Sequence, residues 1–384
     1  MIYFDNAATT MKKPDGVAQA MCAALSSFGG AGRGVHSASL AAGRAVFEAR
    51  ERIADLLDAP SSSCVSFTLN ATMALNIALQ GLVKPGTVVL TTAASHNSVL
   101  RPLFRLRDQA GCKVVIIPIR LDGSLDYDVY EQALSNYDVT LVAVTHASNV
   151  TGDVYDIARM ARAAHKAGAL FVLDAAQTAG CYPFSMKELG VDVLCFTGHK
   201  SLFGPQGTGG LCVSPSVEIP PLLEGGSGVH SFDERHPRFM PEALEAGTVN
   251  AHGLAGLAAG VAYLREVGVE VVHKRVASLA QRFERGTSSC KGVRIVGGHN
   301  SFDRCGIVAL RVQDVDSSAL ADALARDFDI CTRAGAHCAP LMHKSLGTET
   351  DGVVRFSFSY FNTEEEIEVG IKALASCIDK LRGE

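Results

Sequence analysis

The chain has 384 residues, of which 47% are hydrophobic and 20% are charged, and its formal net charge is −5. This length exceeds the size at which a single core keeps growing, so we expect one large domain and a smaller one. The weak negative charge gives no electrostatic reason to expect a nucleic acid or a membrane surface as a partner, and no run approaches the ~18 apolar residues of a membrane helix.

The N-terminal segment reaches a charge at Asp5 before any apolar stretch long enough for a signal peptide. The eleven cysteines are scattered without a C-x-x-C pair, which is typical of free thiols in a reducing compartment. We therefore expect a cytoplasmic protein in which most of the cysteines fill the core.

Helix-like and strand-like patterns alternate between residues 41 and 215. Residues 41–57 have the apolar stripe of an amphipathic helix, and strands are predicted at 65–68, 88–92, 113–119, 139–148, 169–176, 193–198 and 209–214. Several of these strands are almost wholly apolar, as expected when both faces of a sheet are covered. The order predicts an α/β fold with a mostly parallel sheet, which binds ligands at the carboxyl ends of its strands.

The remainder of the chain predicts a smaller α+β C-terminal domain. Residues 215–250 are rich in Gly and Pro and are interpreted as a loop or hairpin excursion, and a long helix pattern covers 251–268. We assign residues 15–255 to the large domain, and residues 1–14 together with 256–384 to the small one.

Polar residues gather where the predicted strands stop. They are Thr72, together with the backbone of Ala71 at the start of a helix, His96, Asn149, Asp174 with Gln177, and Thr197, His199 and Lys200. The sequence "GHKS" is not a phosphate-binding P-loop, because that motif needs a glycine directly before the lysine. Each residue alone is more often a cap, a turn residue or a structural side chain. Together, a lysine, a carboxylate and anion donors are the groups that pyridoxal phosphate needs.

The motifs that carry this constellation run along the whole chain: "DNAATT", "NAT", "SHNSV", "SNVTG", "DAAQTAG", "TGHKSLFGPQGTGGL", "EAGTVN" and "RAGAHCAP". In this order they resemble the class V aminotransferases, which are fold-type I enzymes dependent on pyridoxal 5'-phosphate (PLP). More narrowly, the chain is similar to the branch of cysteine desulfurases and selenocysteine lyases. The resemblance implies a large PLP-binding domain with a central sheet and a smaller domain.

The resemblance also implies a role for each matching residue. Lys200 would hold the cofactor through an imine, Asp174 would pair with the pyridinium nitrogen, and His96 would stack on the ring. Hydrogen bonds to the ring oxygen would come from Asn149 and Gln177. The phosphate would be held by Ala71, Thr72, Thr197 and His199, and by Thr248 of a neighbouring subunit, which implies a homodimer with shared active sites. Relatives usually carry Glu where this chain has Ser95, a difference expected to change hydrogen bonding behind the stacking histidine.

Cys338 is the residue that distinguishes a cysteine desulfurase from other reactions of the resembled family. It lies in "RAGAHCAPLMHKSLG", which has little apolar periodicity and is interpreted as an exposed loop. Positive charge from Arg333, His337, His343 and Lys344 is expected to favour the thiolate, the form that attacks. A zinc site at His337, Cys338 and His343 is the weaker interpretation, because no second Cys or His pair completes it.

Arg355 is predicted to lie in a strand and to bind the α-carboxylate of an amino acid, with an exposed strand-edge arginine as the alternative. The resemblance implies conversion of L-cysteine to L-alanine, with Cys338 taking the sulfur as a persulfide and passing it to a protein acceptor. Asn149 would also contact the substrate. The alternatives are a selenocysteine lyase, another class V aminotransferase or lyase in which Cys338 is incidental, and a non-catalytic scaffold.

Overall fold

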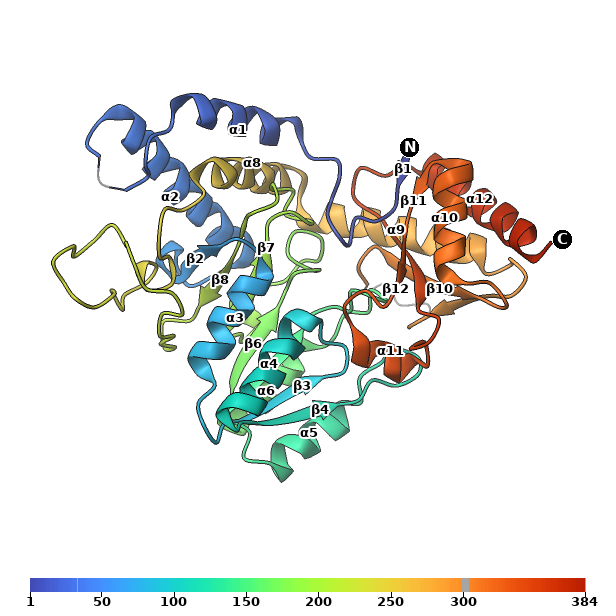
Figure 1. Cartoon of the computed structure of the whole chain (residues 1–384), viewed down its shortest axis with the longest axis horizontal. Helices are drawn as coiled ribbons and strands as arrows, with labels where there is room; N and C mark the ends of the chain where they lie inside the picture. Colours follow the sequence, from blue (N-terminus) through green and yellow to red (C-terminus); the bar gives the residue numbers. More distant parts are fainter. Residues whose placement is uncertain (33, 299–303, 384) are drawn as a thin grey trace.

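The computed structural model describes residues 1–32, 34–298 and 304–383. A central sheet lies between two layers of helices, and a smaller sheet lies at one end of the molecule (Figure 1). The central sheet has the order β2-β8-β7-β6-β5-β3-β4, with bounds β2 (Val65–Thr68), β3 (Val88–Thr92), β4 (Lys113–Ile117), β5 (Leu141–Thr145), β6 (Leu170–Asp174), β7 (Val193–Thr197) and β8 (Gly209–Val213). β8 is antiparallel to β2 and β7, whereas the other neighbouring strands run parallel. The predicted mostly parallel sheet is confirmed.

Helices cover both faces of this sheet because its strands are apolar on both sides. Along β5, Val142 and Val144 face the layer that includes α2, α6 and α8, whereas Leu141 and Ala143 face α3 and α4. The helices of the large domain are α1 (Asp15–Ser27), α2 (Ser37–Leu57), α3 (Ala71–Leu82), α4 (Asn97–Ala110), α5 (Tyr127–Asn136), α6 (Ile157–Lys166), α7 (Met186–Leu189) and α8 (Ala251–Val267).

The smaller sheet is antiparallel and has the order β12-β13-β10-β9. Its strands are β9 (Val293–Val296), β10 (Ile307–Val312), β12 (Arg333–Gly335) and β13 (Val353–Ser357), and its helices are α9 (Val269–Thr287), α10 (Ser317–Phe328), α11 (Pro340–Leu346) and α12 (Glu364–Arg382). One face of the sheet packs on α9, α10 and α12, and the other face joins the core of the large domain.

The N-terminal segment belongs structurally with the small sheet, because β1 (Ile2–Tyr3) pairs with β11 (Ile330–Cys331) and Phe4 packs in its core. Both chain ends lie on this side of the molecule (Figure 1). Residues 215–250 form a loop with one short 3₁₀ turn at Glu242–Leu244, as the loop interpretation predicts.

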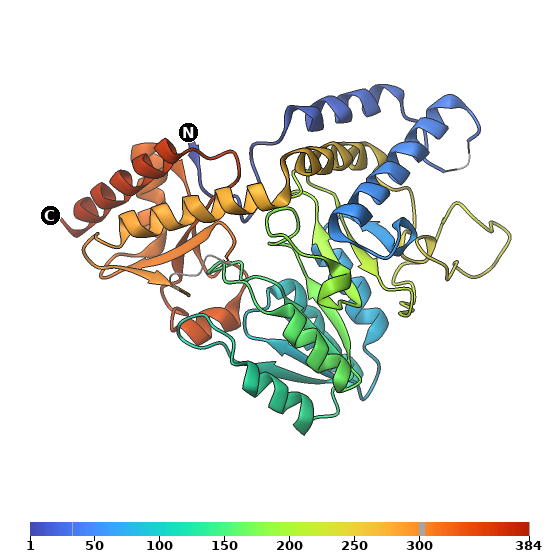
Figure 2. The same cartoon turned by 180° about the vertical axis from the view of Figure 1, so that it is seen from behind.

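The predicted domain boundary after residue 255 falls inside α8. This helix packs along α1 and α2, whereas α9 packs against α12. Seen from behind, α8 and α9 follow one another from the large domain into the small one (Figure 2), and they meet at Gly268. The C-terminal region is thereby carried to the carboxyl ends of the central strands.

Candidate active site

A cavity of about 230 Å³ lies at the carboxyl ends of the central strands. The residues that line it come from both domains and from the N-terminal segment; they are Ala7, Ala8, Asn70, Ala71, Thr72, His96, Ser98, Thr145, Asn149, Asp174, Ala176, Gln177, Thr197, His199, Lys200, Arg333, His337 and Arg355. The cavity thus brings together every predicted site residue except Thr248 and Cys338.

Lys200 lies directly after the turn that ends β7 and lines the cavity together with Asp174. Burial lowers the pKa of its amine to about 8; Asp174 opposes this shift, and the charges of Arg355 and Arg333 add to it. A larger fraction of this amine is therefore neutral at pH 7 than of an exposed lysine, which is the form that attacks a carbonyl group.

Asp174 is the last residue of β6 and is buried, with 4% of its surface exposed. Its Oδ1 accepts a hydrogen bond from the amide of Ala176 at 3.0 Å. Burial raises the pKa of this carboxyl, whereas the hydrogen bond from Ala176 and the charge of Lys200 counteract that shift. A buried carboxylate facing a cavity is stabilised by a cationic ligand group, such as a protonated ring nitrogen.

The loop after β6 approaches Lys200 closely. Gly180 in this loop has a φ of 89°, and a Cβ atom placed there would collide with the backbone carbonyl of Ser201. A glycine is therefore required for Asp174 and Gln177 to sit beside the peptide that carries Lys200.

The side of the cavity at α3 suits an anion. The helix begins at Ala71, and Asn70 caps it by accepting a hydrogen bond from the amide of Met73 at 3.0 Å. The hydroxyl of Thr72 lies 2.8 Å from that of Ser98. Free amides at a helix N-terminus together with hydroxyl groups bind phosphate well.

Several buried polar atoms of the lining have no hydrogen-bond partner among the described residues. They are Oδ1 of Asn149, Oγ1 of Thr197, Nδ1 of His337 and Nε of Arg355. Buried polar atoms are normally paired, so this set fits a polar ligand that supplies both donors and acceptors. Together with the buried carboxylate and the amine of low pKa, these residues fit PLP bound to an amino acid.

The histidine side chains in the cavity are neutral. Burial lowers the pKa of His96 to about 4, helped by the charge of Lys200, and the same two causes lower the pKa of His199 to about 4. Nδ1 of His96 accepts a hydrogen bond from the amide of Ser98 at 3.0 Å, which fixes the ring at the start of α4. A neutral, fixed ring is suited to stacking on a flat cofactor.

The N-terminal segment holds the peptide group that precedes Lys200. The carbonyl of His199 accepts hydrogen bonds from Nζ of Lys13 at 2.8 Å, the amide of Thr10 at 3.1 Å and Oγ1 of Thr9 at 3.2 Å. Burial lowers the pKa of Lys13 to about 8. This contact left no signal in the sequence, because the N-terminal segment approaches the site only through the tertiary fold.

Arg355 lies in β13 with 1% of its surface exposed, so the alternative of an exposed strand-edge arginine is wrong. Its Nη1 donates to the carbonyl of Asn149 at 2.9 Å, and its Nη2 donates to Oδ1 of Asp5 at 2.7 Å. Arg333 is opposite Arg355 on the neighbouring strand β12 and also lines the cavity. Asp5 and Arg333 were not predicted for this part of the site.

Cys338 is exposed in the turn between β12 and α11. The predicted loop is correct for this turn but wrong for its flanks, where Arg333–Gly335 is a strand and Pro340–Leu346 is a helix. The carbonyl of Cys338 accepts a hydrogen bond from the amide of Asn97 at 2.8 Å. The backbone of Cys338 is therefore held at Asn97, the residue after His96, which lines the cavity.

The predicted electrostatic activation of Cys338 by its neighbouring histidines is not supported. Burial lowers the pKa of His337 to about 3 and also lowers the pKa of His343, so both rings are neutral at pH 7. Nδ1 of His343 lies 2.7 Å from Oγ1 of Thr348. Within the described part of the chain, no group of three His, Cys, Asp or Glu residues is placed to hold a metal ion.

Thr248 lies outside this cavity in the same chain. It lines an apolar pocket of about 200 Å³ near the start of α8, together with Leu69, Leu222 and Leu223. These leucines are exposed. A contribution of Thr248 to a phosphate site therefore requires a second subunit.

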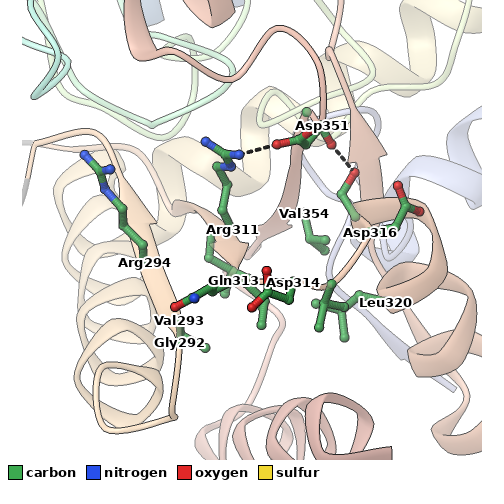
Figure 3. A pocket seen from close by; sticks show the side chains of 15 residues that line it. Gly292, Val293, Arg294, Arg311, Gln313, Asp314, Asp316, Leu320, Asp351 and Val354 are labelled. Atoms are coloured by element: carbon green, nitrogen blue, oxygen red, sulfur yellow. Dashed lines mark hydrogen bonds and ion pairs between the residues drawn. The ribbon is translucent and has the colours of Figure 1, made fainter. Parts of the chain in front are cut away.

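A larger cavity of about 740 Å³ lies on the small domain, away from Lys200. Figure 3 shows Arg294 and Arg311 on its wall, with Arg311 directed at Asp351. Arg311 also donates to the carbonyl of Gly347 at 3.2 Å. This cavity contains none of the predicted site residues, and its ion pair holds the connection between α11 and β13, so we place the chemistry in the smaller cavity.

Comparisons with known proteins agree on one family. The family model "Aminotransferase class-V" matches residues 2–369. The chain is 35% identical to a "Probable cysteine desulfurase" of Methanothermobacter thermautotrophicus, over 96% of this chain and 92% of that protein. It is 31% identical to the cysteine desulfurase CsdA of Escherichia coli, over 99% of this chain and 94% of that protein.

Solved structures give the same result. The apo structure of a cysteine desulfurase from Thermococcus onnurineus superposes with a TM-score of 0.93 and 34% identity, over 100% of this chain and 95% of that one. The S-sulfonic acid form of CsdA from Escherichia coli gives a TM-score of 0.89 and 30% identity, over 99% of this chain and 95% of that one.

Proposed function

Since this chain belongs to the class V aminotransferase family, we propose that it is a PLP-dependent cysteine desulfurase that converts L-cysteine to L-alanine and takes the sulfur on Cys338. The observation that carries this proposal is that the amine of Lys200 and the turn that bears Cys338 meet at one cavity. Lys200 and Asp174 lie in the wall of this cavity. The turn that bears Cys338 is hydrogen-bonded to Asn149, which also lines the cavity, and to Asn97, which lies between the lining residues His96 and Ser98.

The cofactor would be held by the residues that the cavity already gathers. Lys200 would bind its aldehyde carbon and Asp174 its ring nitrogen, while the α3 N-terminus, Thr197 and His199 would hold its phosphate. The ring oxygen would receive hydrogen bonds from Asn149 and Gln177, and His96 would cover the ring face. When bound, PLP withdraws electrons from the α-carbon of the amino acid and so makes its proton labile.

Two arginines bind the substrate carboxylate in this proposal. Nε of Arg355 is buried and has no partner among the described residues, so it is free to donate. Arg333 lines the same wall from the neighbouring strand. Asp5 and the carbonyl of Asn149 fix the guanidinium of Arg355 from the other side, which orients the substrate sulfur towards the Cys338 turn.

Lys200 and Cys338 then carry out the proton transfer and the sulfur transfer. The low pKa of Lys200 increases the fraction of its amine that is neutral, and the neutral amine accepts the α-proton of the substrate. The thiolate of Cys338 attacks the substrate sulfur, so that an S–S bond forms and the Cβ–S bond of the substrate breaks. The electron pair of that bond stays with the carbon skeleton of the substrate. Cβ takes up a proton, and the amine of Lys200 returns a proton to the α-carbon, which gives alanine.

A homodimer with shared sites fits the surface around Thr248. Besides the exposed leucines of the apolar pocket, Phe232 in the 215–250 loop is fully exposed. Exposed apolar patches of this kind mark interaction surfaces. A second copy seated there would bring its own Thr248 to the phosphate end of the neighbouring cavity.

A protein acceptor and a cytoplasmic location complete the proposal. Cys338 is exposed, so a persulfide on it is accessible to a thiol of another protein. All eleven cysteines are free thiols, as in proteins of reducing compartments. In the described residues, no helix is both long and apolar enough to cross a membrane.

The variant Cys338→Ser tests the assignment of the reaction. It is expected to retain the colour of the bound cofactor but to release no alanine from L-cysteine. Undiminished alanine and sulfide production by this variant would favour another class V lyase in which Cys338 is incidental. Parallel assays with selenocysteine distinguish a selenocysteine lyase.

A further inference from the structure

The turn that bears Cys338 has an unusual backbone. His337 and Cys338 both adopt left-handed conformations, with φ values of 50° and 57°. Residues with a side chain rarely occupy this region, and two in succession persist only when the surrounding structure holds them. The position of the thiol therefore depends on whatever restrains these two residues.

Two donors from the large domain provide that restraint. Nδ2 of Asn149 donates to the carbonyl of His337 at 2.7 Å, in a buried hydrogen bond. The amide of Asn97 donates to the carbonyl of Cys338 at 2.8 Å. Each left-handed residue is thus tied to the domain that carries Lys200, although the turn itself belongs to the smaller sheet.

Asn149 is itself firmly placed. It is buried, with 8% of its surface exposed, in a turn where the hydroxyl of Ser148 accepts hydrogen bonds from the amides of Val150 and Thr151. Its backbone carbonyl accepts from Nη1 of Arg355 at 2.9 Å. Asn149 therefore contacts both the arginine proposed for the substrate carboxylate and the turn of the thiol.

The orientation of the Asn149 amide follows from its partner. A backbone carbonyl only accepts hydrogen bonds, so the NH₂ group must face His337. This group has a second proton, for which a ring oxygen of the bound cofactor would be an acceptor. One nitrogen atom can then bridge the cofactor ring and the peptide group next to Cys338.

We propose that Asn149 is a positioning residue for Cys338, whose side-chain amide holds the thiol turn in register with the cofactor ring. This role rests on the proposed function and adds to the hydrogen bond that Asn149 would make to the ring. It makes sulfur transfer, and not only cofactor binding, dependent on Asn149.

A matched pair of isosteric variants separates the proposed role of Asn149 in holding the Cys338 turn from its role in binding the cofactor ring. Asn149→Asp and Gln177→Glu each replace an amide beside the ring oxygen by a carboxylate. Nε2 of Gln177 donates to the carbonyl of Ala7 at 3.2 Å and is not bonded to the Cys338 turn. Only Asn149→Asp therefore removes the restraint on His337, whereas both variants perturb the ring.

The first measurement is hydrogen–deuterium exchange in the holoenzymes. The amide of Ala339, which donates to the carbonyl of Ala336 at 3.0 Å, closes the turn. Its exchange is expected to be at least about fivefold faster in Asn149→Asp than in wild type and unchanged in Gln177→Glu. Wild-type exchange in Asn149→Asp, or equal acceleration in both variants, would overturn the inference.

The second measurement compares two partial reactions in D₂O. Deuterium uptake at the α-carbon of the substrate reports on Lys200, and mass spectrometry reports persulfide on Cys338. The ratio of persulfide formation to α-exchange is expected to fall about tenfold in Asn149→Asp and to stay constant in Gln177→Glu, because misplacement of a reacting group lowers its effective concentration. An unchanged ratio in Asn149→Asp contradicts the positioning role. Absence of persulfide in the wild type would instead contradict the proposed function, and amide exchange would then decide the inference alone.

Discussion

Asp5 and Arg355 form an ion pair of 2.7 Å at the wall of the cavity, although they lie at opposite ends of the chain. The guanidinium is buried, and its pKa is lowered by that burial while Asp5 counteracts the shift. The N-terminal segment thus takes part in the site by fixing the group that we propose to bind the substrate carboxylate.

Asp5→Asn is expected to raise the KM for L-cysteine about tenfold or more, since loss of one partner of a buried pair costs ~2–5 kcal/mol. The kcat should change less, because Asp5 does not contact the reacting atoms. Alanine release at varied cysteine concentrations measures both constants. An unchanged KM would show that Asp5 does not orient Arg355 for binding, and Asp15→Asn on the distant helix α1 is the control.

Lys200→Ala is expected to lose turnover entirely, together with the visible absorbance of the cofactor linked to the enzyme. The physical reason is that the cavity offers one amine beside Asp174 among the described residues that line it. Absorbance spectra and alanine assays test this, with Lys84→Ala as a surface control. Full absorbance in Lys200→Ala would contradict the assignment.

Asp174→Asn is expected to reduce the rate by about 100-fold or more, since preorganised charges at a reacting group contribute on this scale. An amide cannot stabilise a protonated ring nitrogen as a buried carboxylate does. Cofactor retention during dialysis should fall as well. A variant with wild-type rate and retention would place the ring nitrogen elsewhere.

The pKa of Lys200, about 8, predicts the pH dependence of cofactor uptake by the apo-protein. The neutral amine is the reactive form, so the uptake rate should rise with pH through about 8 instead of through the ordinary value of 10.5. Arg333 is one of the charges that lower this pKa, so Arg333→Met should shift the midpoint to higher pH. Stopped-flow absorbance across pH 6.5–9.5 measures it, and a midpoint that stays in place would rule out this influence of Arg333.

A shared-site dimer predicts complementation between Thr248→Val and Lys200→Ala. A mixed dimer of these variants has one site with both defects and one site with neither. Mixing the two variants should therefore give one intact active site per mixed dimer. Lys200→Ala alone has no amine to bind the cofactor, and Thr248→Val alone binds the cofactor weakly. Activity equal to the mean of the separate variants would place Thr248 outside the neighbouring site.

The fold was largely predictable from the sequence, because buried parallel strands leave a strong apolar signal. The predicted strands 65–68 and 88–92 match β2 and β3. The strands predicted at 113–119 and 139–148 extend beyond the ends of β4 and β5 into residues that lie outside the regular strands. The family resemblance and the mostly parallel sheet are confirmed.

The central part of the site was predictable for a related reason. Residues that directly follow parallel strands meet at one sheet edge, so Asp174 and Lys200 could be placed together from the order of the strands. The roles assigned to them, and to Cys338, stay predictions. The N-terminal segment left no local signal, because Asp5 and Lys13 contact Arg355 and the carbonyl of His199 only through tertiary packing. Arg333 was predicted only for its charge near Cys338, and its place in the cavity wall likewise depends on the tertiary fold.

The charge expected around Cys338 shows where sequence proximity misleads. His337 and His343 are close to the thiol in the sequence, yet burial keeps both rings neutral. Adjacent residues in a turn point to different environments, and the periodicity of a short helix such as α11 is too brief to reveal which ones are buried.

Mass spectrometry of the holoenzyme after brief exposure to L-cysteine tests the central claim most directly. The account predicts the gain of one sulfur atom on the peptide that contains Cys338, with alanine released in equal amount. Cys22, the other exposed cysteine, should remain unmodified, and Lys200→Ala should show no gain. Alanine release with Cys338 unmodified, or sulfur found on Cys22 instead, would contradict the account.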